Sequence, residues 1–173
     1  FLMFGGKGGV GKTTIASELK KQLEARGQRA HLVDADEVRA SYQKPLGFSR
    51  EDIRENNRRH ALMAQEKLKD NDLVLVAIVS PFAADRTMVR EMLGQSFILI
   101  YVNAALETVI HRDTMGLYGR ALRGEKDDVI GMTGSKIPYE PPDNAEIEIK
   151  TDQTSVDASV EKIINYLRDQ TNL

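Results

Sequence analysis

The chain has 173 residues, of which 41% are hydrophobic, so a single domain with a sizeable core is expected. Lys and Arg number 24 against 26 Asp and Glu, which argues against bulk binding of nucleic acid. The absence of cysteine excludes disulfides, thiolate zinc sites and a cysteine nucleophile. No apolar run reaches the ~18 residues of a membrane span and no signal peptide is visible, so a cytoplasmic protein with no membrane partner is expected.

Apolar runs predict strands that alternate with helices along the chain. Buried strands are expected at 1–4, 30–33, 73–79 and 97–102, and an edge strand at 146–150. Helices are expected at 12–26, after Ser49, at 85–94, from 105 and at 156–167, with Gly27 ending the first of them. The segment 113–146 is rich in Gly, Pro and charge and is expected to be mobile. This alternation predicts an α/β domain of three layers with a mostly parallel central sheet.

The stretch FGGKGGVGKTT, residues 4–14, lies between the first strand and the first helix. It contains G-x-x-x-x-G-K-[ST], in which backbone N–H groups and a helix N-terminus surround a triphosphate. Lys12 is expected to reach the β- and γ-phosphates, and the Thr13 hydroxyl to hold Mg²⁺. The loop therefore predicts binding of ATP and Mg²⁺ by Gly6, Gly8, Gly9, Gly11, Lys12, Thr13 and Thr14.

The same loop also fits a deviant form, K-G-G-x-G-K-T, because Lys7 precedes two glycines. This form resembles that of the ATPases related to nitrogenase iron protein, in which the lysine would touch phosphate across a dimer. Those ATPases carry an aspartate shortly before a glycine after the third strand, whereas this strand ends Val79-Ser80-Pro81. Lys7 is therefore expected to replace an apolar residue of a kinase loop, with little cost on removal. A dimeric ATPase acting as a switch is the alternative.

Beyond the loop, the chain resembles the adenylylsulfate kinase (APS kinase) family, which uses ATP to phosphorylate the 3′-hydroxyl of adenosine 5′-phosphosulfate. The matching pieces follow one another in unbroken order: DADEVR at 34–39, LGFS at 46–49, REN at 54–56 with Arg58 and Arg59, Ser80-Pro81, Asp85-Arg86, MVRE at 88–91, Arg112-Asp113 with GLY at 116–118, Gly124-Glu125, Thr133-Gly134 and Tyr139-Glu140.

The resemblance implies one phosphate-loop (P-loop) NTPase domain over 1–173 with a mobile lid. The activity would be that of a transferase in sulfate assimilation. A homodimer, a longer parent chain and fusion to or association with another enzyme domain stay open. No nucleic acid is expected as a partner.

The resemblance also assigns roles to individual residues. Asp36 would be the catalytic aspartate and an Mg²⁺ ligand, with Asp34 in support, although a pair of loop-capping aspartates is the alternative. Arg112 would lie at the ATP, and Arg120 and Arg123 elsewhere in the lid. The acceptor would be bound by Arg39, Phe48, Asn56, Val79, Ser80 and Met132. The alternative for Phe48 is an ordinary core aromatic, and whether Ser80 is phosphorylated stays open.

Departures from the family pattern cluster in the acceptor pocket. Ile53 stands in place of an arginine, Met115 of a lysine, Met132 of a phenylalanine and Glu37 of an asparagine. Two cations are lost and one carboxylate is gained, so the pocket is expected to suit an anionic phosphosulfate less well. A less anionic nucleotide, such as a cytidine diphosphate derivative, is the alternative acceptor.

For the remaining arginines and for the histidines, the sequence supports simpler expectations. Arg58, Arg59 and Arg120 would be the first cations to examine as replacements in the acceptor pocket. At least one of the arginines at 54, 58 and 59 is expected to lie on a solvated, salt-bridged helix face. The three histidines lack metal spacing and are expected to be structural.

Overall fold

The computed structural model describes residues 1–33, 37–38, 41–42, 46–113, 116–125, 127, 129–132 and 135–171. Its centre is a five-stranded sheet in the order β2-β3-β1-β4-β5, and every neighbouring pair is parallel. The strands are β1 (Leu2–Gly5), β2 (Ala30–Val33), β3 (Leu73–Ile78), β4 (Ile98–Asn103) and β5 (Ile147–Lys150). The predicted parallel sheet, with 146–150 at its edge, is confirmed.

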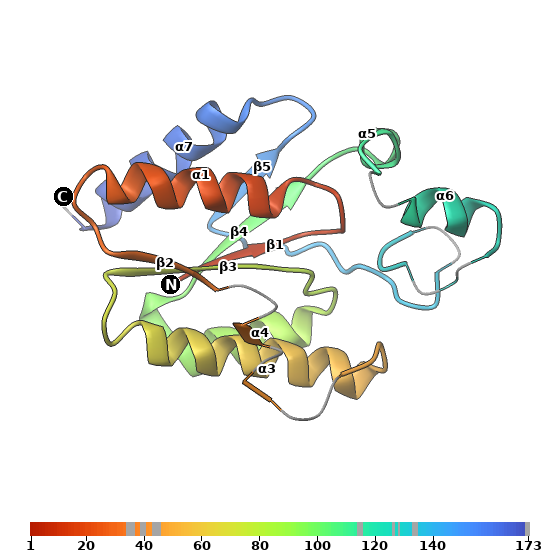
Figure 1. Ribbon diagram of the computed structural model, residues 1–173, viewed down its shortest axis with the longest axis horizontal. Helices are drawn as coiled ribbons and strands as arrows, with labels where there is room; N and C mark the ends of the chain where they lie inside the picture. The colour runs from red at the N-terminus through yellow and green to blue at the C-terminus, as the bar shows by residue number, and fades with distance from the viewer. Residues whose placement is uncertain are drawn as a thin grey trace.

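Helices cover both faces of the sheet, so the predicted three layers are confirmed (Figure 1). On one face lie α1 (Lys12–Glu24) and α7 (Val156–Thr171), and on the other lie α3 (Arg50–Lys67) and α4 (Ala83–Leu93). Each face has its own apolar cluster. Strand β1 contributes to both, because Phe4 packs toward α1 and Met3 toward α3. The sheet is thereby held between two cores that fix the loops at its ends.

Local signals in the sequence set the helix ends. The Ser49 side chain accepts a hydrogen bond from the Asp52 backbone N–H at 3.1 Å, as the capping pattern predicts. Gly27 follows α1 with a φ of 82°, a conformation that suits glycine at a helix end. A short 3₁₀ turn, η1 (Gly94–Ser96), separates α4 from β4. No helix in the described part of the chain is long and apolar enough to cross a membrane.

Two short helices project beyond the carboxyl ends of the strands, α5 (Leu106–His111) and α6 (Leu117–Leu122) (Figure 1). Helix α6 lies in the segment 113–146, in which no helix was expected. It is therefore a difference from the prediction. Its cause is Asp113, whose carboxylate accepts the backbone N–H groups of Leu117, Tyr118 and Gly119 at 2.8–3.1 Å. A carboxylate that satisfies three free N–H groups stabilises a helix that has little propensity of its own.

Candidate active site

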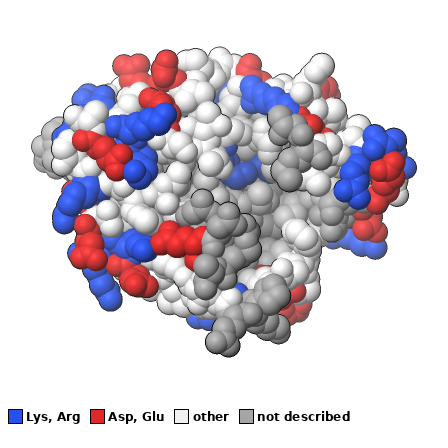
Figure 2. All heavy atoms as spheres, viewed as in Figure 1, with Lys and Arg blue, Asp and Glu red and all other residues white. Residues whose placement is uncertain are grey.

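The candidate site lies at the carboxyl ends of the strands, which is where parallel sheets bind ligands. The loops after β1, β3, β4 and β5 meet there. Figure 2 shows that the surface is hollowed between the body of the molecule and the part formed by α5 and α6, with Lys or Arg atoms inside the hollow. The residues around this hollow belong to segments that are far apart in the chain.

The phosphate loop joins β1 to α1 with geometry that suits an anion. A side chain at Gly6 would place its Cβ 2.2 Å from the Val102 carbonyl oxygen of β4, so only glycine fits. Gly9 and Gly11 have φ values of 73° and 92°, which also favour glycine. No side chain caps the N-terminus of α1. Free N–H groups at a helix N-terminus bind phosphate, so the loop fits the predicted triphosphate.

Lys12 is buried at the base of this loop, with 8% of its surface exposed. Its ammonium donates to the backbone carbonyls of Gly6, at 3.0 Å, and Lys7, at 2.5 Å. Burial lowers the pKa of Lys12 to about 7. Loss of water around the ammonium disfavours its charged form, and the negative charge of a bound phosphate would favour it. Thr13 and Thr14 are exposed at the start of α1.

A cavity of about 600 Å³ opens beside the loop and contains Gly9, Gly11, Lys12, Thr13 and Thr14 in its wall. Arg112 lines it from the end of α5 and donates to the Thr151 hydroxyl at 3.0 Å and to the Thr151 carbonyl at 2.8 Å. The Thr151 hydroxyl donates to the Val10 carbonyl at 2.8 Å. Loop, Arg112 and Thr151 are thus joined, and the cavity has a size that ligand sites commonly have.

The opposite wall of this cavity was missed by the sequence reasoning. It consists of the segment after β5 and the start of α7: Thr151, Thr154, Ser155, Val156 and Ser159. The signal available was the position of 151–155 just past a parallel strand, at the edge where ligands bind. None of these residue types indicates nucleotide binding alone.

Several residues expected to bind the acceptor lie in or just before α3 and in the loop after β3, and this region is called the acceptor side. Phe48 precedes α3 and is 60% exposed, so the alternative of an ordinary core aromatic is wrong. Asn56 is partly buried, and its carbonyl lies 2.8 Å from His60 Nδ1. Val79 is partly buried and Ser80 is fully buried, both immediately after β3. The exposed phenylalanine ring offers a face on which a planar base could stack.

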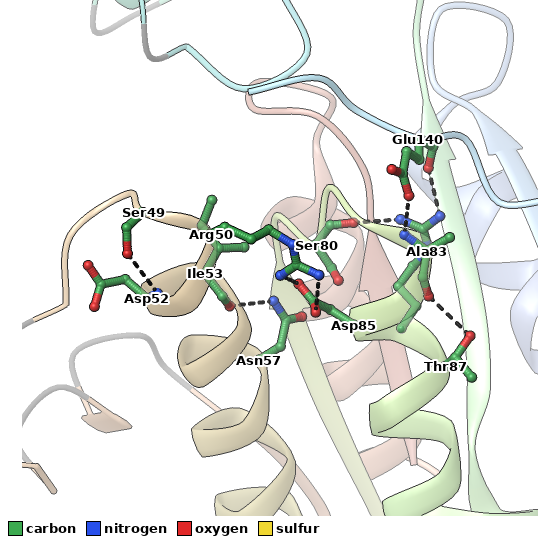
Figure 3. Close-up of polar contacts among 11 residues, drawn as sticks. Ser49, Arg50, Asp52, Ile53, Asn57, Ser80, Ala83, Asp85, Thr87 and Glu140 are labelled. Atoms are coloured by element: carbon green, nitrogen blue, oxygen red, sulfur yellow. Dashed lines mark hydrogen bonds and ion pairs between the residues drawn. The ribbon is translucent and has the colours of Figure 1, made fainter. Parts of the chain in front are cut away.

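Two arginines make hydrogen bonds that connect α3, α4 and the loop after β3 (Figure 3). Arg50, at the start of α3, donates through both Nη atoms to the Asp85 carboxylate of α4 at 2.8 Å each. Asp85 is fully buried, and the Arg50 guanidinium lies 4.2 Å from the Phe82 ring centre. Arg86 donates to the carbonyls of Ser80, at 2.7 Å, and Glu140, at 2.6 Å. The loop after β3 is therefore fixed from two sides.

Buried polar atoms in this region lack partners within the described chain. They are the Ser80 hydroxyl, Asn57 Oδ1 and the Tyr139 hydroxyl. Asn57 uses only its amide N–H, which donates to the Ile53 carbonyl at 2.9 Å (Figure 3). Because an unpaired buried polar group costs about 1–3 kcal/mol, such groups indicate a site that a ligand completes.

The charged residues that were expected to alter the acceptor pocket, or to replace its lost cations, are largely paired with residues of opposite charge. Glu37 lies 2.7 Å from Lys67 Nζ and 3.1 Å from His31 Nε2, and the Lys67 hydrogen bond is the main cause that lowers the Glu37 pKa. The gained carboxylate is therefore neutralised by α3. Arg58 and Arg59 both pair with Glu55, Arg58 as an exposed surface pair as predicted.

The other two altered positions that the structure describes are apolar and buried. Ile53 has 6% of its surface exposed and Met132 has 8%, and Met132 belongs to the apolar cluster beneath α1. Arg120 and Arg123, predicted in the lid, both pair with Glu125. Four residues of the prediction lie outside the described residues: Asp34, Asp36, Arg39 and Met115.

A divalent cation would have one described ligand, the hydroxyl of Thr13, which faces the cavity beside the loop. Within the described ranges, no group of three or more His, Asp or Glu side chains could hold a metal. A hydroxyl beside bound phosphates is the donor that Mg²⁺ uses in phosphate-loop enzymes, since the phosphates supply most other ligands. The residues therefore fit Mg²⁺ brought in with a nucleotide, and a resident metal site is not formed by this part of the chain.

Comparison with known proteins points to one family. A family model described as adenylylsulphate kinase matches residues 1–150. An adenylyl-sulfate kinase of Halothermothrix orenii is 40% identical over 167 residues, which cover 96% of this chain and 88% of that protein. A probable adenylyl-sulfate kinase of Pseudomonas aeruginosa is 44% identical over 94% of this chain and 74% of its own. The structure of the APS kinase of Mycobacterium tuberculosis, in complex with AMPPNP and APS, superposes with a TM-score of 0.87 at 29% identity, covering 96% of each chain.

Proposed function

Because the chain belongs to the adenylylsulphate kinase family, we propose that it transfers the γ-phosphate of ATP to the 3′-hydroxyl of adenosine 5′-phosphosulfate. The product would be 3′-phosphoadenosine 5′-phosphosulfate. The chain is a phosphotransferase of the phosphate-loop class, and membership of this family removes the support for a dimeric ATPase switch. A homodimer and a cytoplasmic location remain expectations.

One observation supports the proposal most directly: the buried Lys12 shares one cavity with Thr13, Thr14, Arg112 and Thr151. Ser80, one of the residues expected to bind the acceptor, follows strand β3, which is the parallel neighbour of the strand that precedes the phosphate loop. Phosphoryl transfer needs two substrates in line and neutralisation of the phosphoryl charge more than it needs covalent chemistry. A phosphate loop between two binding regions meets that need.

The chain's own residues have distinct tasks in this reaction. The loop N–H groups and Lys12 bind the β- and γ-phosphates, and Arg112 covers the donor nucleotide. Asp36, which comes three residues after Val33 in the sequence, is proposed to orient the acceptor hydroxyl and take its proton. Arg39, Phe48, Asn56, Val79, Ser80 and Met132 are proposed to hold the acceptor. Mg²⁺, when bound near Thr13 and Asp36, would neutralise charge on the phosphates.

A second acceptor is favoured by one observation, the apolar and buried Ile53 where the family has an arginine. A pocket without that cation would discriminate less strongly against a nucleotide with a less anionic end group. A cytidine diphosphate derivative is the example to test, with the same transfer to a hydroxyl.

The test is a panel assay with Mg-ATP and several nucleotides that carry a free 3′-hydroxyl. Transfer to the phosphosulfate, at a rate well above ATP hydrolysis without acceptor, is the expected result. Lys12→Ala, checked for folding by thermal unfolding, is the negative control. If ATP is hydrolysed and no phosphate is transferred to any of the nucleotides, the result would instead support the switch ATPase.

A further inference from the structure

Lys7 is the residue that makes the phosphate loop unusual, and the structure gives its side chain a definite position. It follows Gly6 directly at the end of β1, and its carbonyl accepts the Lys12 ammonium. A Cβ atom built on Gly131 would lie 3.1 Å from Lys7 Cε and 3.2 Å from Lys7 Cδ. The aliphatic part of Lys7 therefore lies across Gly131, in the space that a side chain there would occupy.

Gly131 is fixed in the segment that carries Met132. Its N–H donates to the Ile137 carbonyl at 2.8 Å, its φ is 74°, and its Cβ would come within 2.8 Å of Tyr139 Cβ. Positive φ and lack of space both require glycine here. A side chain here would collide with the Lys7 stem, so the glycine lets Lys7 pack directly against the segment 129–132.

The ammonium of Lys7 has no assigned partner in the described part of the chain: no carboxylate there lies within ion-pair distance of it, and no hydrogen-bond acceptor is assigned to it. By contrast, Arg58 and Arg59 share Glu55, and Arg120 pairs with Glu125. Arg50, one helical turn before Ile53, is held on Asp85 through both Nη atoms. These four arginines are thus neutralised, whereas no carboxylate of the described residues pairs with Lys7.

We propose that Lys7 binds an anionic group of the acceptor nucleotide within its own chain, beside Met132, the residue that follows Gly131. This inference rests on the proposed kinase function and names a further residue of its acceptor site. It revises the expectation that loss of Lys7 costs little. It also separates Lys7 from the deviant-loop lysine, since its stem lies against its own chain and needs no second copy.

The experiment compares Lys7→Met, which removes the charge, with Lys7→Arg, which keeps it. Lys69→Met is the matched control, because Lys69 is exposed beyond the end of α3, at the opposite end of the sheet. The dissociation constant of adenosine 5′-phosphosulfate is measured by calorimetry without ATP, and KM for acceptor and for ATP by assay. Lys7→Met should raise Kd and KM for the acceptor about tenfold to a hundredfold, the range of a charge-assisted hydrogen bond. Lys7→Arg and Lys69→Met should leave the acceptor Kd near the natural value.

Added salt should weaken acceptor binding by the natural protein more than by Lys7→Met, since the interaction is ionic. Lys7→Gln repeats the measurement if Lys7→Met unfolds. An unchanged acceptor Kd, or a loss confined to kcat or to the KM for ATP, overturns the proposal. If the natural protein neither binds nor uses the phosphosulfate, the proposed acceptor is wrong, and the same comparison with the nucleotide that it does use decides the role of Lys7.

Discussion

At the scale of single residues, Lys12 combines two properties that are seldom found together, a buried ammonium and a role that needs its charge. Its pKa is lowered to about 7 because burial removes water from the charged form. In the nucleotide-free protein Lys12 therefore loses its proton as the pH rises through about 7. Bound phosphates favour the charged form, so binding must be coupled to uptake of a proton.

We therefore predict that a non-hydrolysable Mg-ATP analogue binds with proton uptake at pH 8, and that its affinity falls as the pH rises above about 7. Calorimetry in two buffers with different ionisation enthalpies measures the uptake. Lys12→Met should remove both the uptake and the pH dependence. An equal uptake in Lys12→Met would assign the proton to another group.

Asp36 gives a second prediction at this scale. If it handles the acceptor hydroxyl, Asp36→Asn should lower kcat by about 10²–10⁴, the range of a general base, and leave ATP binding nearly intact. Single-turnover transfer and nucleotide titration separate the two quantities. A fall of less than about tenfold would reduce Asp36 to a loop cap.

At the scale of elements, the junction of α3 and α4 combines apolar packing with an ion pair between Arg50 and Asp85. Asp85 is fully buried, while the Arg50 side chain that pairs with it is 39% exposed. Removing the arginine would leave a carboxylate without its partner in the interior. Loss of one partner of a buried pair is strongly destabilising, although exposure of Arg50 reduces the effect.

We predict that Arg50→Met lowers the free energy of unfolding by about 2 kcal/mol, and that Arg50→Met with Asp85→Leu recovers most of this loss. Arg58→Met is the control, because its pair with Glu55 is on the surface and should contribute less than about 1 kcal/mol. Denaturant unfolding measures all three. If the double variant is as unstable as Arg50→Met, the Asp85 carboxylate has another partner.

The elements also show how far the sequence could predict the fold and site. The strands at 30–33 and 73–79 were predictable because continuous apolar runs are typical of buried parallel strands, and Ser49 with Asp52 is a local cap. Helix α6 was not, since its capping group, Asp113, lies four residues before the first helical residue and Gly119 lies inside the helix. The Arg50–Asp85 pair joins residues 35 apart, and no local pattern announces such a contact.

At the scale of the whole molecule, the proposed acceptor pocket draws on residues from Lys7 to Met132, so its charge is set by several distant segments together. We predict that Ile53→Arg with Met115→Lys raises kcat/KM for adenosine 5′-phosphosulfate relative to a cytidine diphosphate derivative. Two charge-assisted hydrogen bonds correspond to at most about two to four orders of magnitude. Lys7 should make the gain smaller.

Steady-state assays of both nucleotides measure this change, with Ile53→Leu as the control for repacking and thermal unfolding as the check on folding. The prediction of an altered acceptor is wrong if the natural protein already reaches about 10⁵ M⁻¹s⁻¹ with the phosphosulfate and the double change brings no gain.

The hydrogen bond from Thr151 to the Val10 carbonyl also bears on the order in which the protein becomes active during its synthesis. The ribosome makes the phosphate loop, residues 4–14, long before it makes residues 151–159, which form the far wall of the donor cavity. The central strand β1 likewise cannot pair until its neighbours in the sheet, β3 and β4, have been synthesised. A nascent chain therefore carries the loop long before it can enclose a nucleotide. Bound ATP can therefore stabilise the folded state only in chains in which strand β5 has already joined the sheet.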